Sequence, residues 1–264
     1  MIETLVLTPP FFLFDEEFDV PRRFRHDTRE GFCFTRSKPD GYRNNQDAMA
    51  VVSGIDDALV LAVADGLGGL PNGAKVARRV VESLASLTFA SLPECIQSVN
   101  DAMASDGFVG GCTLAAVEIV CGQVVVHHVG DAGALVVSDS GAVRLKTVPH
   151  SPVGYAEAHE GLGEAAALSH PRRHVVSNMI GDDRMWIETS APVTLQPGDT
   201  VVVASDGLWD NFFRKEIVEM VVNDDLLAVS QAIVNQATAR MAATPASVPA
   251  KKDDLSFIVF RFAG

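Results

Sequence analysis

Four separated aspartates each stand next to a short apolar run in the sequence. Asp65 and Asp206 lie near the ends of the similar segments LVLAVADG and VVVASDG, whereas Asp47 and Asp253 come just before an apolar run. The runs have the length and the β-branched content of buried strands. If these strands belong to facing or neighbouring sheets, the four carboxylates converge at one edge of the fold.

Converging carboxylates repel one another, so such a site is stable only when cations lie between them. Ligand sets made only of oxygen favour the hard ions Mg²⁺ and Mn²⁺. Two such ions can activate a water molecule and hold a phosphoryl oxygen, and they supply local positive charge for an anionic substrate. Each aspartate alone is typical of a turn or a helix cap, so the prediction depends on all four together.

The segment around Asp65 predicts a strand, a tight turn and a helix in succession. The apolar run 58–64 delivers Asp65 to a strand end, and the glycines that follow allow the backbone to approach a bound ion. A helical pattern begins near Asn72, with apolar residues at helical spacing as far as Leu87.

Strand patterns dominate the rest of the chain. Four closely spaced strands between residues 110 and 147 suggest an antiparallel sheet. Residues 149–174 then change to a Gly-, Ala-, Glu- and His-rich pattern, helical at 164–168, which we interpret as a lid. Further strands are expected at 174–180, 186–189, 200–207 and 255–262, and helices at 93–103, 215–222 and 226–241.

The length and composition are typical of one globular domain. The chain has 264 residues, of which 47% are hydrophobic and 21% charged, and we find no repeat or interdomain linker in it. We assign residues 31–264 to a single domain that contains the lid, and residues 1–30 to an N-terminal extension or edge strand.

Charge, hydropathy and cysteine usage exclude several classes of partner. The net charge of −13 argues against nucleic acid, because phosphate backbones require a basic face. No apolar run is long enough to span a membrane, and the N-terminus lacks the basic leader of a secretory signal. The four cysteines occur singly, which predicts reduced core residues and a cytoplasmic location rather than disulfides or a zinc site.

Seven short motifs follow one another along residues 41–262. They are RNNQD (43–47), VADGLGG (63–69), GCT (111–113), VGD (129–131), PHSPV (149–153), SDGLWD (205–210) and DDLS (253–256). In this order they resemble the motifs of the PPM (type 2C) family of metal-dependent serine/threonine protein phosphatases, and those of its bacterial branch in particular.

This resemblance implies an α+β fold, a four-layer αββα sandwich of two antiparallel β-sheets flanked by helices. It also implies hydrolysis of phosphoserine and phosphothreonine by a hydroxide that bridges two Mn²⁺ or Mg²⁺ ions, without a covalent phosphoenzyme. The implied partners are phosphorylated proteins that belong to a Ser/Thr kinase system.

The resemblance also implies a set of site residues. Arg43, Asp65 and Asp206 form the expected catalytic group. The expected ligands of the two ions are Asp47, Asp65, the Gly66 carbonyl, Asp206 and Asp253. Asp253 is chosen over Asp254 because Asp254 stands where the family has asparagine. Asp210 and Asp106 are the candidate ligands of a third, weaker ion.

Several positions depart from the family pattern. Arg43 is the candidate phosphate clamp, but it lies one residue closer to Asp47 than usual, which leaves Arg36 as its rival. Gln46 replaces a glutamate and can still hydrogen-bond a metal-bound water. Leu67 stands where animal relatives have a histidine proposed as the acid, so the leaving group is expected to take its proton from water.

Other polar residues receive no chemical role from the sequence. Asp131 lacks the Ser-Arg that often follows it in the family, and we interpret it as a turn residue. His127 and His128 are adjacent on a predicted strand and therefore point to opposite faces, so they cannot share one metal. Ser205 lacks the paired base of a nucleophile.

Two alternative functions stay open. One is a catalytically weak regulator of the same fold that binds phosphoproteins or kinases, although loss of the metal aspartates would be its mark and all four principal positions are acidic. The other is a hydrolase of a small phosphate ester, which a closed pocket would favour over an open, lid-flanked site.

Overall fold

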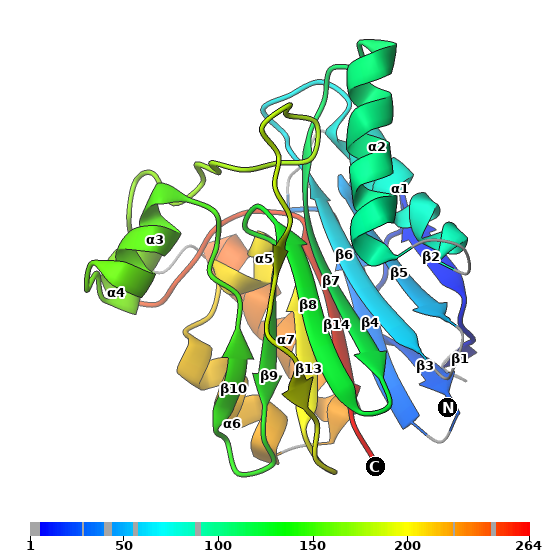
Figure 1. The fold of residues 1–264 in the computed structure, drawn as a ribbon. Helices are drawn as coiled ribbons and strands as arrows, with labels where there is room; N and C mark the ends of the chain where they lie inside the picture. Colours follow the sequence, from blue (N-terminus) through cyan, green and yellow to red (C-terminus); the bar gives the residue numbers. More distant parts are fainter. Residues whose placement is uncertain are drawn as a thin grey trace.

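Two stacked β-sheets form the centre of the protein in a computed structural model, with helices on both outer faces (Figure 1). The structure describes residues 6–27, 29–39, 44–54, 58–87, 91–223, 225–243 and 247–264. Within these ranges each sheet has 7 strands. The predicted αββα sandwich is therefore confirmed.

The first sheet contains strands from both the N-terminal and the C-terminal parts of the chain. Its neighbours are antiparallel except for the parallel pair β1 and β3. In spatial order its strands are β1 (Val6–Leu7), β3 (Arg22–His26), β4 (Arg29–Arg36), β14 (Leu255–Arg261), β13 (Thr200–Ala204), β9 (Gly133–Val137) and β10 (Val143–Lys146).

The second sheet is antiparallel throughout. Its spatial order is β11 (Glu188–Thr189), β8 (Gln123–Val129), β7 (Cys112–Val120), β6 (Leu59–Gly66), β5 (Asp47–Ser53) and β2 (Phe11–Phe14), and β12 (Val193–Thr194) also pairs with β8. The segment treated in the sequence as an extension or edge strand thus contributes strands to both sheets.

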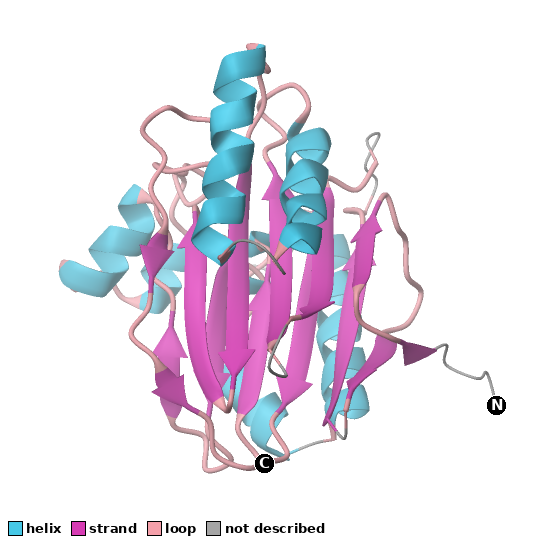
Figure 2. Cartoon of the chain, turned by 45° about the vertical axis from the view of Figure 1, so that its right-hand side comes forward, coloured by secondary structure: helices cyan, strands magenta, loops and turns pink. Residues whose placement is uncertain are grey.

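Helices cover the outer faces of the two sheets, as Figure 2 shows. Helices α1 (Gly73–Ser83) and α2 (Leu92–Asp106) pack on the second sheet. Helices α6 (Arg214–Asn223) and α7 (Leu226–Ala243) pack on the first. Each of these helices was predicted from its apolar spacing.

Alternating side chains of the central strands divide the core into two parts. Met49 and Leu61 face the core between the sheets, whereas Ala50 and Ala62 face the core beneath α1 and α2. Because alanine side chains are short, the helices pack close to the strands on this side. This packing fixes the end of β6, where Asp65 lies, against the start of α1.

The four strands predicted between residues 110 and 147 do not form one sheet. Strands β7 and β8 belong to the second sheet, whereas β9 and β10 belong to the first. The chain crosses at Gly130, whose φ is +90° and where a Cβ atom would lie 2.4 Å from the Thr113 side chain. The prediction was wrong because strand periodicity does not show which sheet a strand joins.

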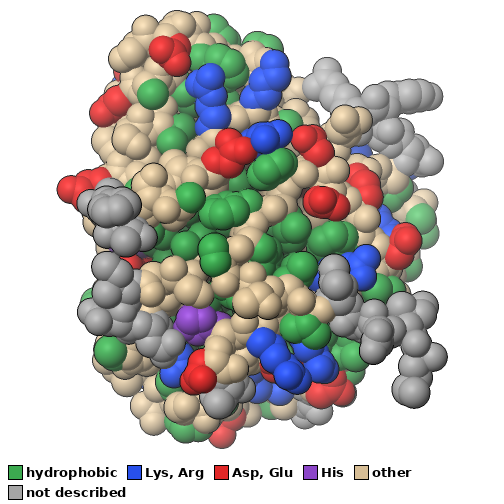
Figure 3. Space-filling model, turned by 90° about the vertical axis from the view of Figure 1, so that its right-hand side faces the viewer, with side chains coloured by type: hydrophobic (Ala, Val, Ile, Leu, Met, Phe, Trp, Pro, Cys, Tyr) green, Lys and Arg blue, Asp and Glu red, His purple; other side chains and the backbone are tan. Residues whose placement is uncertain are grey.

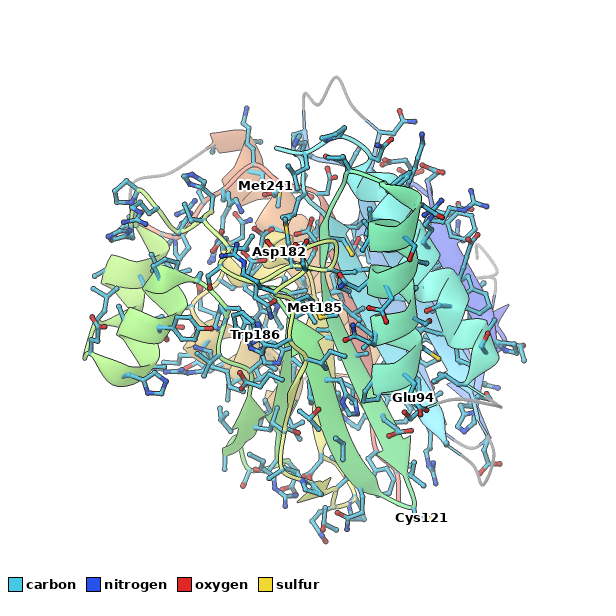
Figure 4. All side chains as sticks on the ribbon, turned by 45° about the horizontal axis from the view of Figure 1, so that its top comes forward. Glu94, Cys121, Asp182, Met185, Trp186 and Met241 are labelled. Atoms are coloured by element: carbon cyan, nitrogen blue, oxygen red, sulfur yellow. The ribbon has the colours of Figure 1, made fainter. Side chains whose placement is uncertain are left out.

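The prediction of a strand at 174–180 is also wrong, because this segment forms a loop with one bridge between Cys112 and Ile180. The strand predicted at 186–189 is shortened to β11. Side-chain hydrogen bonds replace the ladder: the Asn178 amide donates to the Trp186 carbonyl at 2.8 Å and accepts the Trp186 N–H at 3.3 Å. Figure 4 shows Asp182, Met185 and Trp186 along this loop.

The segment interpreted as a lid holds two short helices beside the first sheet, α3 (Pro152–His159) and α4 (Glu164–Leu168) (Figure 1). The Ser151 hydroxyl accepts the Gly154 N–H at 2.9 Å and caps α3. A pocket lies between these helices, β9 and the turn from α5 (Asp206–Trp209) to α6.

The face toward α1 and β2 carries hydrophobic side chains in its middle and charges of both signs around them (Figure 3). No helix among the described residues has the length and apolar character required to cross a bilayer.

Candidate metal centre

Three aspartates converge at one end of the sandwich. One carboxylate oxygen from each of Asp65, Asp131 and Asp206 lies within 4.8 Å of the other two. Asp65 comes from the end of β6 in the second sheet, and Asp206 follows β13 in the first sheet. The two similar sequence segments are therefore brought together from facing sheets.

Asp131 completes this group because the chain changes sheets immediately beside it. Its interpretation as a turn residue is corrected by its position next to Asp65 and Asp206. The Gly-Asp dipeptide after an apolar strand was the available signal. The crossing between sheets, which directs the carboxylate into the cluster, was not visible in the sequence.

Asp47 lies directly beside Asp65, since the two residues are paired across β5 and β6. Its side chain is buried, and its Oδ2 atom accepts a hydrogen bond from Ser205 Oγ at 2.9 Å. Its Oδ1 atom is buried without a hydrogen-bond partner among the described residues. A buried carboxylate oxygen without a donor is costly, and a bound cation would satisfy it.

Asp206 begins the short helix α5 rather than ending a strand, and the next residue fixes its place. A Cβ atom at Gly207 would lie 1.8 Å from the carbonyl oxygen of Asp254, so only glycine allows the two segments to approach this closely. This contact brings the Asp253–Asp254 segment beside Asp206.

Asp253 and Asp254 have different surroundings. Asp254 accepts the backbone N–H groups of Lys38 at 2.9 Å and Gln46 at 2.8 Å, and so it holds the segment that leads to Asp47. Asp253 instead lies 2.9 Å from Lys251 Nζ, the same cation that contacts Asp206. Asp253 therefore lies with Asp206 around the Lys251 ammonium, whereas Asp254 lies beside Asp47.

Lys251 places its ammonium group among the acidic side chains. Its Nζ atom contacts Asp206 Oδ2 and lies 3.1 Å from Asp210 Oδ2. Burial alone would lower the pKa of Lys251, but the adjacent carboxylates raise it well above its usual range. Asp210 has a second cationic neighbour in Arg173, at 3.6 Å.

The buried carboxylates perturb one another strongly. Burial raises the pKa of Asp47 to about 7 and that of Asp131 to about 6. Burial, followed by the charges of Asp47 and Asp206, raises the pKa of Asp65 well above its usual range. Burial also raises the pKa of Asp206, against the opposing charge of Lys251. These carboxylates can all be ionised at the same time only when additional positive charge lies among them.

Gln46 and Leu67 lie on either side of Gly66. The Gln46 carbonyl accepts the Gly66 N–H at 3.1 Å, and the Leu67 N–H donates to the Gly111 carbonyl at 3.0 Å. These bonds hold the end of β6 at the acidic cluster. The half-buried Leu67 side chain offers no proton donor there.

Three predicted site residues lie elsewhere or cannot be placed. The exposed Asp106 carboxylate, at the end of α2, lies 3.9 Å from Arg79 and is not grouped with the clustered carboxylates. Arg36 ends β4 and forms an ion pair with Asp19 at 2.8 Å. Arg43 is outside the described residues.

A second cluster joins His128, His150 and Glu188, which the sequence analysis did not connect. His150 Nδ1 accepts the Gly130 N–H at 3.2 Å and an Asn178 amide hydrogen at 2.8 Å. The ring proton therefore lies on Nε2, which donates to Glu188 at 3.0 Å. These bonds engage both ring nitrogens of His150. The cluster therefore supports the backbone beside Asp131.

The acidic cluster fits hard divalent cations. Its donors are all oxygen, its carboxylates repel one another, and one Asp47 oxygen is buried without a partner among the described residues. These properties match Mg²⁺ or Mn²⁺. The fold and this centre define a class of two-sheet proteins with an acidic cluster suited to divalent ions at one end of the sandwich.

Comparisons with known proteins agree with this class. The family model described as Stage II sporulation protein E matches residues 55–263. A Streptococcus pyogenes protein named as a protein phosphatase 2C-type is 31% identical over 191 residues, covering 66% of this chain and 77% of that protein. The serine/threonine phosphatase stp of Listeria monocytogenes is 28% identical over 198 residues, covering 67% and 77%.

Solved structures show the same fold. The serine/threonine phosphatase Stp1 from Staphylococcus aureus superposes with a TM-score of 0.75 at 20% identity, covering 89% of this chain and 95% of that one. The catalytic domain of the phosphatase PstP, solved with 2 manganese ions, gives a TM-score of 0.67 at 20% identity and covers 89% and 99%. The family match over residues 55–263 and the 31% identical Streptococcus pyogenes relative show that this chain belongs to the PPM family of metal-dependent protein phosphatases.

Proposed function

We propose that this protein hydrolyses phosphoserine and phosphothreonine in proteins with the help of two divalent ions. The observation that carries the proposal is the convergence of Asp65, Asp131 and Asp206 from facing sheets, with oxygen atoms within 4.8 Å of one another. Membership of the PPM family supplies the class of reaction. The choice between Mn²⁺ and Mg²⁺ is part of the proposal.

The chain's own residues would hold and orient the reacting groups. Bound divalent ions supply an activated water and positive charge for the phosphoryl oxygens. The residues proposed to hold them are Asp47, Asp65, the Gly66 carbonyl, Asp131, Asp206 and Asp253. Ser205 orients Asp47 through its hydrogen bond of 2.9 Å. Because Leu67 offers no proton, the leaving group would be protonated by water.

The pocket beside the lid helices supports a protein substrate over a small phosphate ester. It adjoins Asp131 and Asp206, and its walls include the apolar side chains of Leu168, Trp209 and Phe212. A peptide can place an apolar side chain there while its phosphate lies at the carboxylates. We further propose a Ser/Thr kinase as the source of the substrate and a cytoplasmic location.

The decisive experiment replaces the central carboxylates. We expect Asp65→Asn and Asp206→Asn to lower phosphate release from a phosphoserine peptide with Mn²⁺ by more than about 100-fold, since even indirect metal-site changes cost 10–100-fold. Asp106→Asn is the matched control because that carboxylate lies outside the cluster, and it should keep wild-type activity. Wild-type rates in both folded cluster variants would contradict the proposal.

The same assay separates the alternatives. A regulator of the same fold would bind the phosphopeptide without releasing phosphate, even with Mn²⁺ present. A small-ester hydrolase would release phosphate from free phosphoserine faster than from the peptide. Either result would replace phosphoprotein hydrolysis as the function.

Arg43 remains the proposed phosphate clamp and Arg36 its rival. Arg36 is engaged by Asp19 at 2.8 Å and lies over the Phe34 ring at 5.4 Å, which favours a structural role for it. We therefore expect Arg43→Ala to raise the KM for phosphopeptide far more than Arg36→Ala does. The opposite order would assign the clamp to Arg36.

A further inference from the structure

Lys251 makes three ionic contacts with carboxylates at the centre. Its Nζ atom touches Asp206 Oδ2 and lies 2.9 Å from Asp253 Oδ2 and 3.1 Å from Asp210 Oδ2. The Lys251 side chain is only 16% exposed. An ammonium group surrounded by three carboxylate oxygens occupies the kind of position that a metal ion takes in an acidic cluster.

The backbone of Lys251 is fixed by a buried side chain. Asn211 Oδ1 accepts the Lys251 N–H, and Asn211 Nδ2 donates to the Lys251 carbonyl, both at 2.9 Å. Asn211 is fully buried and also donates to the Gly207 carbonyl at 2.9 Å. The same side chain thus ties the Lys251 backbone to the segment that carries Asp206.

Arg173 adds a second cation next to Lys251. It lies 3.6 Å from Asp210 Oδ2, and it donates to the Ala250 carbonyl at 3.1 Å and to the carbonyl of Leu168 at the end of α4. Asp210 is therefore approached by two cationic side chains. A metal ion at Asp210 would have to displace them or share the site with them.

The charges in the cluster agree with this arrangement. When all are ionised, the acidic side chains at the centre other than Asp254 contribute six negative charges, of which Lys251 and Arg173 balance two. The remaining four are matched by two divalent ions. Asp254 is not counted because the charge of Lys38 lies beside it. The acidic side chains counted are Asp47, Asp65, Asp131, Asp206, Asp210 and Asp253.

Because Asp206 and Asp253 are also proposed ligands of the two ions, the contact that decides the role of Lys251 is the one with Asp210. We infer that Lys251, assisted by Arg173, replaces a third metal ion at Asp210 in this protein, so that the centre holds two divalent ions and Asp210 serves as a partner for cationic side chains. This inference rests on the proposed function, because it concerns the same centre. It makes Lys251 a positioning residue that acts through Asp206, Asp210 and Asp253. It also gives Asp210 a role different from the one expected from the sequence.

The test is the number of Mn²⁺ ions bound per chain, measured by equilibrium dialysis with elemental analysis. We expect two ions for the wild type, two for Lys251→Arg, which keeps the charge, and three for Lys251→Met, which keeps the length but removes the charge. Asp210→Asn should leave the wild-type count of two unchanged, and this arm does not require a Lys251 variant to fold. Circular dichroism confirms the fold of each variant.

Activity at varied Mn²⁺ gives an independent measurement. At low Mn²⁺ we expect Lys251→Met to lose about 10- to 100-fold in kcat, the usual cost of losing a group that orients metal ligands. High Mn²⁺ should restore part of this loss, and Lys251→Arg should resemble the wild type.

The outcomes are distinguishable. Three ions in the wild type, or two in the folded Lys251→Met variant, would overturn the role of Lys251 and leave the phosphatase proposal intact. Absence of any bound Mn²⁺ in the wild type would overturn the proposed function together with this inference.

Discussion

At the residue scale, the hydrogen bond from Ser205 to Asp47 has a measurable consequence. Ser205 is fully buried and donates to Asp47 Oδ2 at 2.9 Å. Ser205→Ala would remove this hydrogen bond and hold the carboxylate less firmly in its orientation. We expect Mn²⁺ affinity to fall about 10- to 100-fold, as is typical for groups that orient metal ligands.

Isothermal titration of Mn²⁺ into the two proteins would measure this change. Ser98→Ala is a suitable control, because the Ser98 hydroxyl donates to the Cys95 carbonyl within α2, away from the acidic cluster. Equal Mn²⁺ affinity of Ser205→Ala and the wild type would show that Ser205 does not position Asp47.

Residue types and order predicted much of the centre, but not its side-chain contacts. The similar segments around Asp65 and Asp206 indicated strand ends, and the structure brings them together. Lys251 was not predicted, since a lysine before an aspartate in a loop is ordinarily a solvated charge. Its role depends on the Asn211 contacts, which join residues 40 positions apart.

At the element scale, the crossing from β8 to β9 depends on His150. This side chain is fully buried, accepts the Gly130 N–H and an Asn178 amide hydrogen, and donates to Glu188. His150→Phe would leave two donors unsatisfied, at about 1–3 kcal/mol each. We expect the free energy of unfolding in urea to fall by about 2–5 kcal/mol, within the range of broken buried networks.

The matched control is Glu188→Gln, which alters the same network at its exposed end, where the carboxylate side chain is 49% exposed. Its cost should stay below about 1 kcal/mol, as for other exposed ion pairs. Similar losses for both variants would mean that the buried contacts of His150 with Gly130 and Asn178 contribute little.

Elements were easier to predict than their assignment to sheets. Helix α7 and strand β14 follow directly from their apolar spacing, because that spacing reports the buried face. The division of four consecutive strands between two sheets, and the loop held by Asn178, depend on contacts between distant residues. Local periodicity does not contain that information. The position of Asp131 was missed for this reason.

At the scale of the whole molecule, burying several carboxylates together makes stability depend on pH and metal. Burial raises the pKa of Asp47 to about 7 and that of Asp131 to about 6, from a usual value of 3.8. As pH rises from about 4 to 7, the unfolded chain loses these protons before the folded chain does. Without metal, stability is therefore greatest at the low end of this range and falls as pH rises through it.

Mn²⁺ should oppose this loss, because binding requires ionised carboxylates and stabilises only the folded chain. We expect Mn²⁺ to raise the melting temperature little at about pH 5 and strongly at about pH 8, whereas with EDTA the melting temperature falls between these values. Thermal melting at a series of pH values measures both effects. Asp65→Asn should lose most of the Mn²⁺-dependent rise at every pH. A rise that is equally large at both ends of the series would show that Mn²⁺ binds away from the buried carboxylates.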